Sequence, residues 1–277
     1  ASKLRTGSSF SPSSSRSDAS SGVTFVWTLL AGALVFFMQA GFAFLGAGLI
    51  RAKNTVNYLT KNILDFAAGG LSFWAFGFAF MFGGSDMYPG LAEGNAIIGY
   101  SGFFLTTAAY DVSTTMFWFF QMVFCATTVS ICSGAMAERI KLWPFFLFAA
   151  ILAGVIYPIV MGWQWGGGWL AEIGFSDFAG STLVHSTGGA AALAGIMLLG
   201  ARYGRFDSKG EAKAIKPFAA SSIPLVTVGV FILWLGWFGF NGGSQLAIGT
   251  FDDAVAVSSI FINTNLAACG GVMAAAI

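Results

Sequence analysis

The chain has 277 residues, a formal net charge of +1, 56% hydrophobic residues and only 9% charged residues. Roughly a quarter of the residues of a soluble domain are charged, so this composition excludes an ordinary soluble protein and predicts a polytopic membrane protein. The near-zero net charge indicates no nucleic-acid partner. The 37 glycines fit close packing of helices in lipid.

The cysteine and histidine content indicates no cofactor, no metal site and no enzyme chemistry. Cys125, Cys132 and Cys269 lie in apolar runs, and three cysteines are too few for a disulfide framework. We favour buried small hydrophobic side chains over a redox or metal role for them. One histidine, without a cysteine pair at ligand spacing, does not make a transition-metal site. The pattern also contains no nucleophile–base pair.

The first 22 residues differ from the rest of the chain. Residues 1–22 are rich in serine and lack apolar periodicity, which predicts a disordered tail. A targeting remnant is the alternative, but the stretch lacks the apolar core of a signal peptide. Residues 23–277 contain seven apolar segments of about the ~20 residues that a membrane helix needs, which predicts an all-α transmembrane domain. The segments are 23–50, 64–83, 114–137, 143–163, 181–200, 222–247 and 254–277.

Charged residues alternate between the connections, and this alternation predicts the orientation of the helices. Beyond the tail, all Lys and Arg residues fall after the first, third and fifth segments, whereas the other connections carry acids. Basic connections are typically cytoplasmic, so we expect a multi-pass protein of the cell membrane with its N-terminus outside. The basic residues are Arg51, Lys53, Lys61, Arg139, Lys141, Arg202, Arg205, Lys209, Lys213 and Lys216; the acidic ones are Asp86, Glu93, Asp111, Glu172, Asp177, Asp252 and Asp253.

Two polar residues mark the fifth segment. Asp177 stands at its outer end, where its carboxylate is expected to cap the helix, to attract a cation, or to do both. His185 follows eight residues later, about 12 Å deeper at 1.5 Å per residue. A histidine inside a span is expensive, so we favour a pore-lining role over a packing role. A neutral imidazole can donate one hydrogen bond and accept another from a small polar solute.

Aromatic and glycine patterns occur near the ends of three other segments. Trp165 is followed by three glycines, which allow a tight turn and close approach of the backbone. Phe120 and Phe124 share one helix face, as do Phe240 and Ser244. Taken singly, these residues are also explained by an interfacial aromatic belt or by packing. Gly239 and Gly243 have the spacing of a close helix–helix contact.

Several motifs, in the same order along the chain, resemble those of the ammonium transporter (Amt/Mep/Rh) family. The resemblance runs from about residue 25 to residue 277, and Trp165 and Ser244 make it closer to the Amt branch than to the Rh branch. The matching motifs are Gly46–Arg51, Asn54–Asn57, Gly134–Arg139, Trp165–Gly168, Asp177–Ala190 and Gly236–Ser244.

The resemblance implies a helical bundle with a pseudo-twofold inverted repeat, of whose eleven helices about seven are present here. It also implies a homotrimer with one pore per protomer and a PII-type regulator on the cytoplasmic face. Each site residue is carried over at its matching motif. Phe120, Trp165 and Ser244 resemble an outer recruitment site for ammonium, with Asp177 as the essential acid beside it. Phe124 and Phe240 resemble a stacked aromatic gate, and His185 resembles the first histidine of the family's pore pair.

The sequence departs from the family pattern at the second pore histidine. His185 is the single histidine of these 277 residues, and we expect the chain to be a fragment that lacks the last helices. Ammonium and potassium have the same charge and similar size, so a charged filter separates them poorly. Loss of a proton removes the charge of ammonium, and potassium has no proton to lose. The main hypothesis is therefore ammonium transport, and the alternative is an ammonium sensor coupled to a C-terminal signalling domain.

Overall fold

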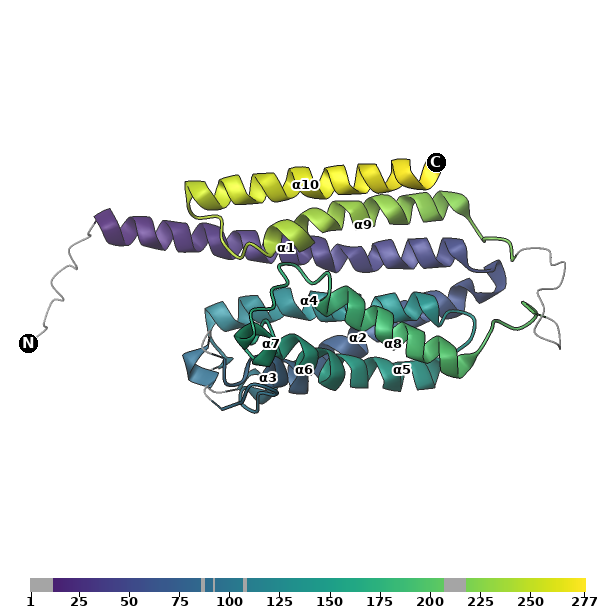
Figure 1. Cartoon of the computed structure of the whole chain (residues 1–277), viewed down its shortest axis with the longest axis horizontal. Helices are drawn as coiled ribbons and strands as arrows, with labels where there is room; N and C mark the ends of the chain where they lie inside the picture. Colours follow the sequence, from purple (N-terminus) through teal and green to yellow (C-terminus); the bar gives the residue numbers. More distant parts are fainter. Residues whose placement is uncertain (1–11, 86–87, 92, 107–108, 207–217) are drawn as a thin grey trace, which may run out of the picture.

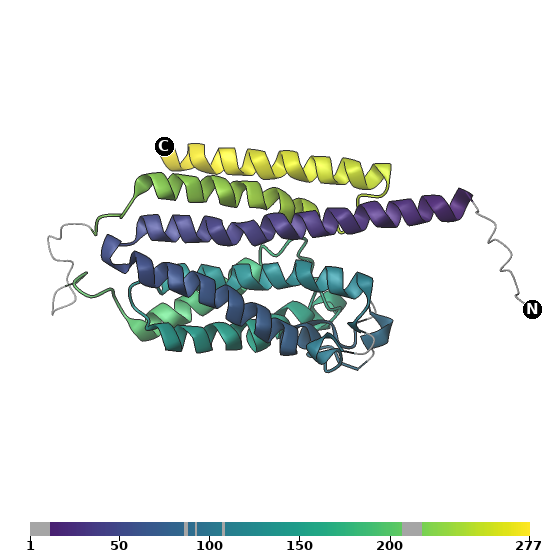
Figure 2. The ribbon, with the colours of Figure 1, turned by 180° about the vertical axis from the view of Figure 1, so that it is seen from behind.

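The structure, a computed structural model, describes residues 12–85, 88–91, 93–106, 109–206 and 218–277. The described residues form helices and connections, without a named β-strand. The helices lie roughly along one direction, with α1, α9 and α10 on one side and α2 to α8 on the other (Figure 1). The same separation is visible from behind (Figure 2). The predicted all-α bundle is confirmed.

The helical segments are interrupted by short 3₁₀ and π turns. The α-helices are α1 (Pro12–Leu49), α2 (Thr55–Ser72), α3 (Phe78–Phe82), α4 (Val112–Ala135), α5 (Leu142–Ile151), α6 (Tyr157–Gly162), α7 (Trp169–Glu172), α8 (Leu183–Leu199), α9 (Ile223–Gly243) and α10 (Phe251–Ala276). The π turns η2 (Phe73–Gly77) and η6 (Leu152–Ile156) join α2 to α3 and α5 to α6. Pro158 has no N–H to donate to the carbonyl of Gly154, which accounts for the irregular turn at η6.

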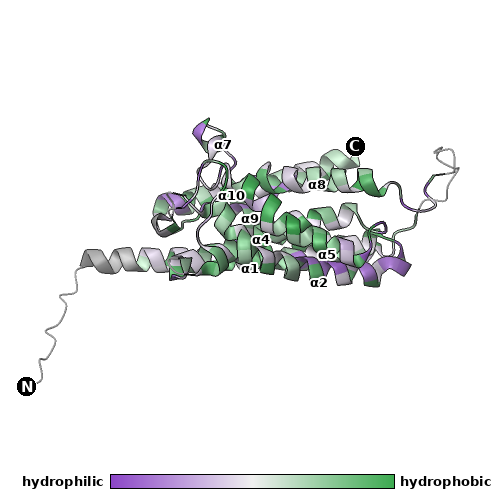
Figure 3. Ribbon diagram, turned by 90° about the horizontal axis from the view of Figure 1, so that it is seen from below, coloured by the Kyte–Doolittle hydropathy of each residue, from purple (hydrophilic) through white to green (hydrophobic). Residues whose placement is uncertain are grey.

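Six of the described helical stretches are long and apolar enough to cross a membrane. They are Ala19–Leu49, Ala52–Phe82, Val112–Ala135, Leu142–Gly162, Ile223–Gly243 and Phe251–Ala276. The remaining predicted segment, 181–200, corresponds to α8, a shorter apolar helix of 17 residues. Hydrophobic residues dominate the helix bodies, and hydrophilic residues gather at the two ends of the bundle (Figure 3).

Two boundaries differ from the sequence-based expectation. Helix α1 begins at Pro12, so residues 12–22 of the expected disordered tail are helical, while residues 1–11 lie outside the described residues. Helix propagation adds a hydrogen bond per residue, so an apolar helix can extend into a polar flank. The second span begins at Ala52 rather than at residue 64, so Lys61 lies inside a helix and not in a connection.

The connections after the first, third and fifth segments meet at one end of the bundle. Glu138, in the turn after α4, accepts hydrogen bonds from Arg51 Nε at 2.9 Å and from Arg202 at 3.1 Å. Asn54 Nδ2 donates to the same carboxylate at 2.7 Å. At the opposite end, Trp169 N donates to the Ala96 carbonyl. Among the described residues, basic and acidic connections therefore lie at opposite ends, as the charge pattern predicts, and Asp86, Lys209, Lys213 and Lys216 lie outside the described residues.

Glycines allow α9 to pack closely on α1. A Cβ atom at Gly239 would lie 2.7 Å from the Ala31 carbonyl oxygen. A Cβ atom at Gly243 would lie 2.6 Å from Ala31 Cβ and 2.8 Å from the Phe120 ring. The close contact predicted from the Gly239–Gly243 spacing is confirmed, and it holds α9 against the site described next.

Candidate functional site

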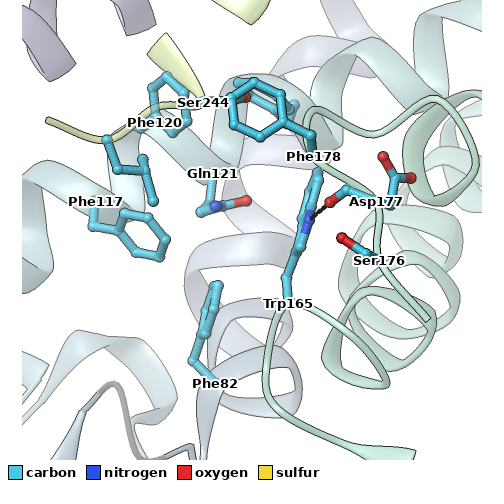
Figure 4. A pocket seen from close by; sticks show the side chains of 11 residues that line it. Phe82, Phe117, Phe120, Gln121, Trp165, Ser176, Asp177, Phe178 and Ser244 are labelled. Carbon is cyan, nitrogen blue, oxygen red and sulfur yellow. Dashed lines mark hydrogen bonds between the residues drawn. The ribbon is translucent and has the colours of Figure 1, made fainter. Parts of the chain in front are cut away.

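An aromatic cavity of about 220 Å³ opens near the acidic end of the bundle. Its side chains come from α3, α4, the loops before α7 and before α8, and the end of α9 (Figure 4). Phe120, Trp165, Asp177 and Ser244, which the sequence predicts to act together, all line it. The full lining is Phe82, Phe117, Phe120, Gln121, Phe124, Trp165, Ser176, Asp177, Phe178, Ser244 and Leu246. We call this the outer cavity.

The turn after α6 positions Trp165 in the outer cavity. Gly167 has φ of +80°, a conformation that favours glycine. A Cβ atom at Gly168 would lie 2.5 Å from the Ala96 carbonyl oxygen, so the turn is pressed against the loop before α4. The indole Nε1 of Trp165 donates to the Asp177 carbonyl oxygen at 2.8 Å. The three glycines therefore produce the tight turn and close backbone approach that the sequence predicts.

The carboxylate of Asp177 is held by the start of α8. Its Oδ1 accepts from the amides of Gly180 at 2.8 Å and Ser181 at 3.1 Å. Its Oδ2 accepts from Thr182 at 2.9 Å and Leu183 at 2.7 Å. These four bonds stabilise the buried charge and satisfy amides at a helix start. Figure 4 shows the carboxylate on the side away from Trp165. The capping interpretation of Asp177 is therefore confirmed by geometry.

Phenylalanine rings close the inner end of the outer cavity. The rings of Phe124 and Phe240 are stacked, with centroids 3.9 Å apart and planes at 27°. Phe120 packs on Phe124 at 4.7 Å between centroids, and Trp165 lies 6.1 Å from Phe124. All three phenylalanines are buried. Phe120 and Phe124, which share one face of α4, thus form a continuous aromatic contact with Phe240 of α9.

Few polar atoms face the outer cavity. Ser244 Oγ donates to the Phe240 carbonyl at 2.8 Å, which leaves its lone pairs free to accept. Gln121 lines the same cavity, and its buried Oε1 has no hydrogen-bond partner among the described residues. Sequence reasoning missed Gln121, although it is the one amide side chain in the aromatic run that opens α4. Ser176 was missed as well, and no sequence signal marks it.

His185 lies beyond the stacked rings, in a second cavity of about 310 Å³. We call this the inner cavity. The imidazole lies 5.2 Å from the Trp237 ring and 5.8 Å from the Phe240 ring, measured between centroids. Its Nε2 is buried and has no hydrogen-bond partner among the described residues. Phe240 lines the inner cavity and Phe124 lines the outer one, so the stacked pair separates them.

The part of the chain that the structure describes holds no group of three or more His, Cys, Asp or Glu side chains arranged for a metal ion. Cys125 and Cys132 are buried, and Cys269 is half-buried. The two cavities present aromatic faces, one amide, hydroxyls and an imidazole. Such groups suit a small polar solute or a single cation.

Comparison with known proteins identifies the family. A family model described as the Ammonium Transporter Family matches residues 26–277. The chain belongs to this family. It is a multi-pass membrane protein, and its resemblance to the Amt/Mep/Rh sequences is confirmed.

Named relatives in the family are transporters. The chain is 47% identical to ammonium transporter Amt2 of Archaeoglobus fulgidus over 263 residues, which cover 91% of this chain and 53% of that protein. It is 38% identical to ammonium transporter 3 of Dictyostelium discoideum over 247 residues, covering 86% of this chain and 54% of that protein. The chain thus spans about half the length of the curated relatives it matches.

Solved structures of the family share the fold. The structure of a sensor Amt protein matches with a TM-score of 0.81 and 36% identity, covering 91% of this chain and 61% of that one. Mep2 of Candida albicans matches with a TM-score of 0.69 and 29% identity, covering 84% of this chain and 50% of that one.

Proposed function

We propose that the full-length protein transports ammonium across a membrane. The observation that carries this proposal is the partition made by Phe124 and Phe240, with an aromatic cavity on one side and His185 on the other. The family of the chain and the names of its relatives support the substrate. Phe120, Trp165 and Ser244 recruit ammonium in the outer cavity, where Gln121 offers a further acceptor.

Energetics explain why the cation gives up a proton at the partition. A cation–π contact contributes about 2 kcal/mol in a desolvated site. Desolvating an ion costs several kcal/mol or more, so aromatic rings recruit ammonium but cannot carry it through an apolar passage. Ammonia is neutral and passes the rings of Phe124 and Phe240, while the released proton crosses separately and rejoins ammonia on the inner side, so that each ammonium carries one net charge across. Potassium has no proton to lose and is excluded.

His185 receives ammonia on the inner side of the partition. His185 lines the inner cavity and its Nε2 lacks a partner among the described residues, so a small solute can supply the missing hydrogen bond. Asp177 acts indirectly, because its carboxylate is occupied by four amides of the chain. Its role is to fix the start of α8 and, through its carbonyl, the indole of Trp165.

The proposal also covers the location of the protein, its oligomeric state and its regulator. The protein lies in the cell membrane with its N-terminus outside, because basic connections favour the cytoplasmic side. It assembles as a homotrimer, and a PII-type regulator binds its cytoplasmic face. The family resemblance supports these last two statements, and gel filtration with pull-down of a PII protein tests them.

Transport is tested on the full-length protein in proteoliposomes. Addition of ammonium is expected to evoke a current that protein-free vesicles lack, and an equal concentration of potassium is expected to evoke none. Absence of an ammonium response in vesicles that contain folded protein would contradict the proposal.

A sensor is the second candidate function, because a structure titled as a sensor Amt protein matches this chain over 91% of its length. In this case the same outer cavity binds ammonium, and a signalling domain responds. A sensor is distinguished from a transporter by ammonium binding without ammonium flux.

A further inference from the structure

A buried polar cluster lies away from both cavities, where α1, α2, α4 and α5 pack together. Lys61 and Asp65 of α2 are each only 1% exposed. They are one helical turn apart, so their side chains share a face of α2. We define this group as the α2 cluster; its members are Gln39, Lys61, Asn62, Asp65, Ser130 and Ser133.

Hydrogen bonds join the cluster across three helices. Gln39 Nε2 of α1 donates to Asp65 Oδ1 at 3.0 Å and to the Asn62 carbonyl at 2.8 Å. Ser130 of α4 donates to Gln39 Oε1 at 2.8 Å. The amide of Gln39 is therefore fixed in orientation, with its donor side toward α2. Gln39 thus donates a hydrogen bond to the carboxylate of Asp65 inside the membrane span.

Lys61 has few partners for a buried ammonium group. Its Nζ donates to the Ser133 carbonyl at 3.4 Å and lies 4.6 Å from the centroid of the Phe145 ring. An ammonium group has three donors, and a buried charge is costly unless it is paired. Asp65, one turn away, is the acidic side chain that shares its face of α2.

Three buried polar atoms of the cluster have no hydrogen-bond partner among the described residues. They are Asp65 Oδ2, Ser133 Oγ and Asn62 Nδ2. Together they provide an acceptor, a hydroxyl that can donate or accept, and a donor. Buried polar groups of this kind typically hold an ordered water with two to four hydrogen bonds.

We propose that Asp65, beside Lys61, binds a proton inside the membrane. A hydronium ion gives its proton to the Asp65 carboxylate, which yields a carboxylic acid and one water. Uptake of this proton raises the net charge of the pair by one. The two side chains lie one helical turn apart on α2, so the charge of one affects the proton affinity of the other. This site does not depend on the transport activity proposed above.

Other titratable groups near the pair come from α2 and α4. Tyr58 of α2 lies with its ring centroid 5.7 Å from Lys61 Nζ. Cys132 of α4 adjoins Ser133, and its thiol contacts the carbonyls of Thr128 and Gly188. From α1 and α5 the contacts described here are those of Gln39 and Phe145, which do not titrate. Asp65 and Lys61 are therefore the groups to probe.

The test is pH-dependent infrared spectroscopy of the full-length protein in lipid vesicles. We expect a protonated-carboxyl band that is present above about pH 5, where exposed carboxyl groups are ionised, and that shifts after transfer to heavy water. The band should vanish in Asp65→Asn and persist in the control Asp111→Asn. Hydrogen bonds from Ser113 and Thr114 hold the pKa of exposed Asp111 at about 2, so this control removes no band in that range.

Lys61 is tested in the same spectra. Removal of its charge in Lys61→Met should raise the midpoint of the band by about one pH unit or more, a tenfold gain in proton affinity. If either single variant fails to fold, the double variant Lys61→Met/Asp65→Asn removes both charges and must lack the band. The proposal would be overturned if the band persisted in Asp65→Asn, did not shift in heavy water, or kept the parent's midpoint pH in Lys61→Met.

Discussion

The rings of Phe124 and Phe240 lie face to face, 3.9 Å apart, between the outer cavity and the cavity that contains His185. The two residues come from α4 and α9, which are separated by more than a hundred positions in the chain. Helix α1 contacts both α4 and α9, and Gly243 of α9 leaves room for the Phe120 ring. The partition therefore depends on the close packing of α1, α4 and α9 around the two rings.

Substitution of Asp177 separates its capping role from substrate binding. In Asp177→Ala, four amides at the start of α8 lose their acceptor, and we expect a loss of about 2 kcal/mol of folding free energy or more. Asp177→Asn keeps one acceptor oxygen and should lose less. Unfolding in detergent, followed by tryptophan fluorescence, measures both. If Asp177→Asn folds like the parent but binds no ammonium, the carboxylate contacts substrate directly.

His185 is expected to matter for flux and not for folding. His185→Ala removes the imidazole from the inner cavity, so ammonium uptake by the full-length protein should fall by tenfold or more, as expected for loss of one positioned hydrogen bond of about 1.4 kcal/mol. His185→Gln retains a donor and an acceptor and should recover part of the uptake. Uptake unchanged in His185→Ala, with folded protein in the vesicles, would assign His185 to packing.

Glu138 holds the basic end of the bundle together, and its stability contribution depends on pH. Burial raises the pKa of its carboxyl, but hydrogen bonds from Arg51 and Asn54 outweigh burial and hold that pKa at about 2. A depressed pKa stabilises the fold above the unfolded value near 4.5, and this contribution is lost as pH falls toward 2. Glu138→Ala leaves Arg51 and Arg202, which are partly exposed, without their partner and should cost about 1 to 2 kcal/mol.

Thermal unfolding between about pH 6 and pH 3 checks both statements about Glu138. The parent protein should lose stability toward the acidic end, and Glu138→Ala should lose less over the same range, because it lacks the titrating group. Glu172→Ala is the matched control on the acidic end of the bundle. Parallel pH profiles for the parent and Glu138→Ala would show that the carboxylate does not stabilise the turn.

Much of the fold could be predicted because a helix that spans lipid must be apolar over about 20 residues. The apolar runs and the alternating charges indicated the helices and the two ends of the bundle. The rule misplaced Lys61. It predicts that the second span begins after this charge, whereas the folded helix buries the side chain of Lys61 on the face of α2 that carries Asp65, the hydrogen-bond partner of Gln39. It also failed at α1, where helix continues into serines that carry no apolar signal.

The candidate site was predicted in part. Motif resemblance marked Phe120, Phe124, Trp165, Asp177, His185, Phe240 and Ser244, and the structure gathers them around two adjoining cavities. Gln121 and Ser176 could not be found, because their importance lies in facing the cavity and not in their spacing. The direction of the Asp177 carboxylate, toward α8, likewise depends on three-dimensional geometry.

The central claim is that the stacked pair lets ammonia pass and excludes potassium, and Phe240→Ala tests it most directly. Ammonium and potassium currents are measured for the full-length protein in proteoliposomes, with Phe231→Ala, an exposed position of the same helix, as control. We predict that Phe240→Ala joins the two cavities, admits potassium and lowers the ammonium-to-potassium current ratio by about tenfold or more, while Phe231→Ala keeps the parent ratio. An unchanged ratio in folded Phe240→Ala would contradict the account.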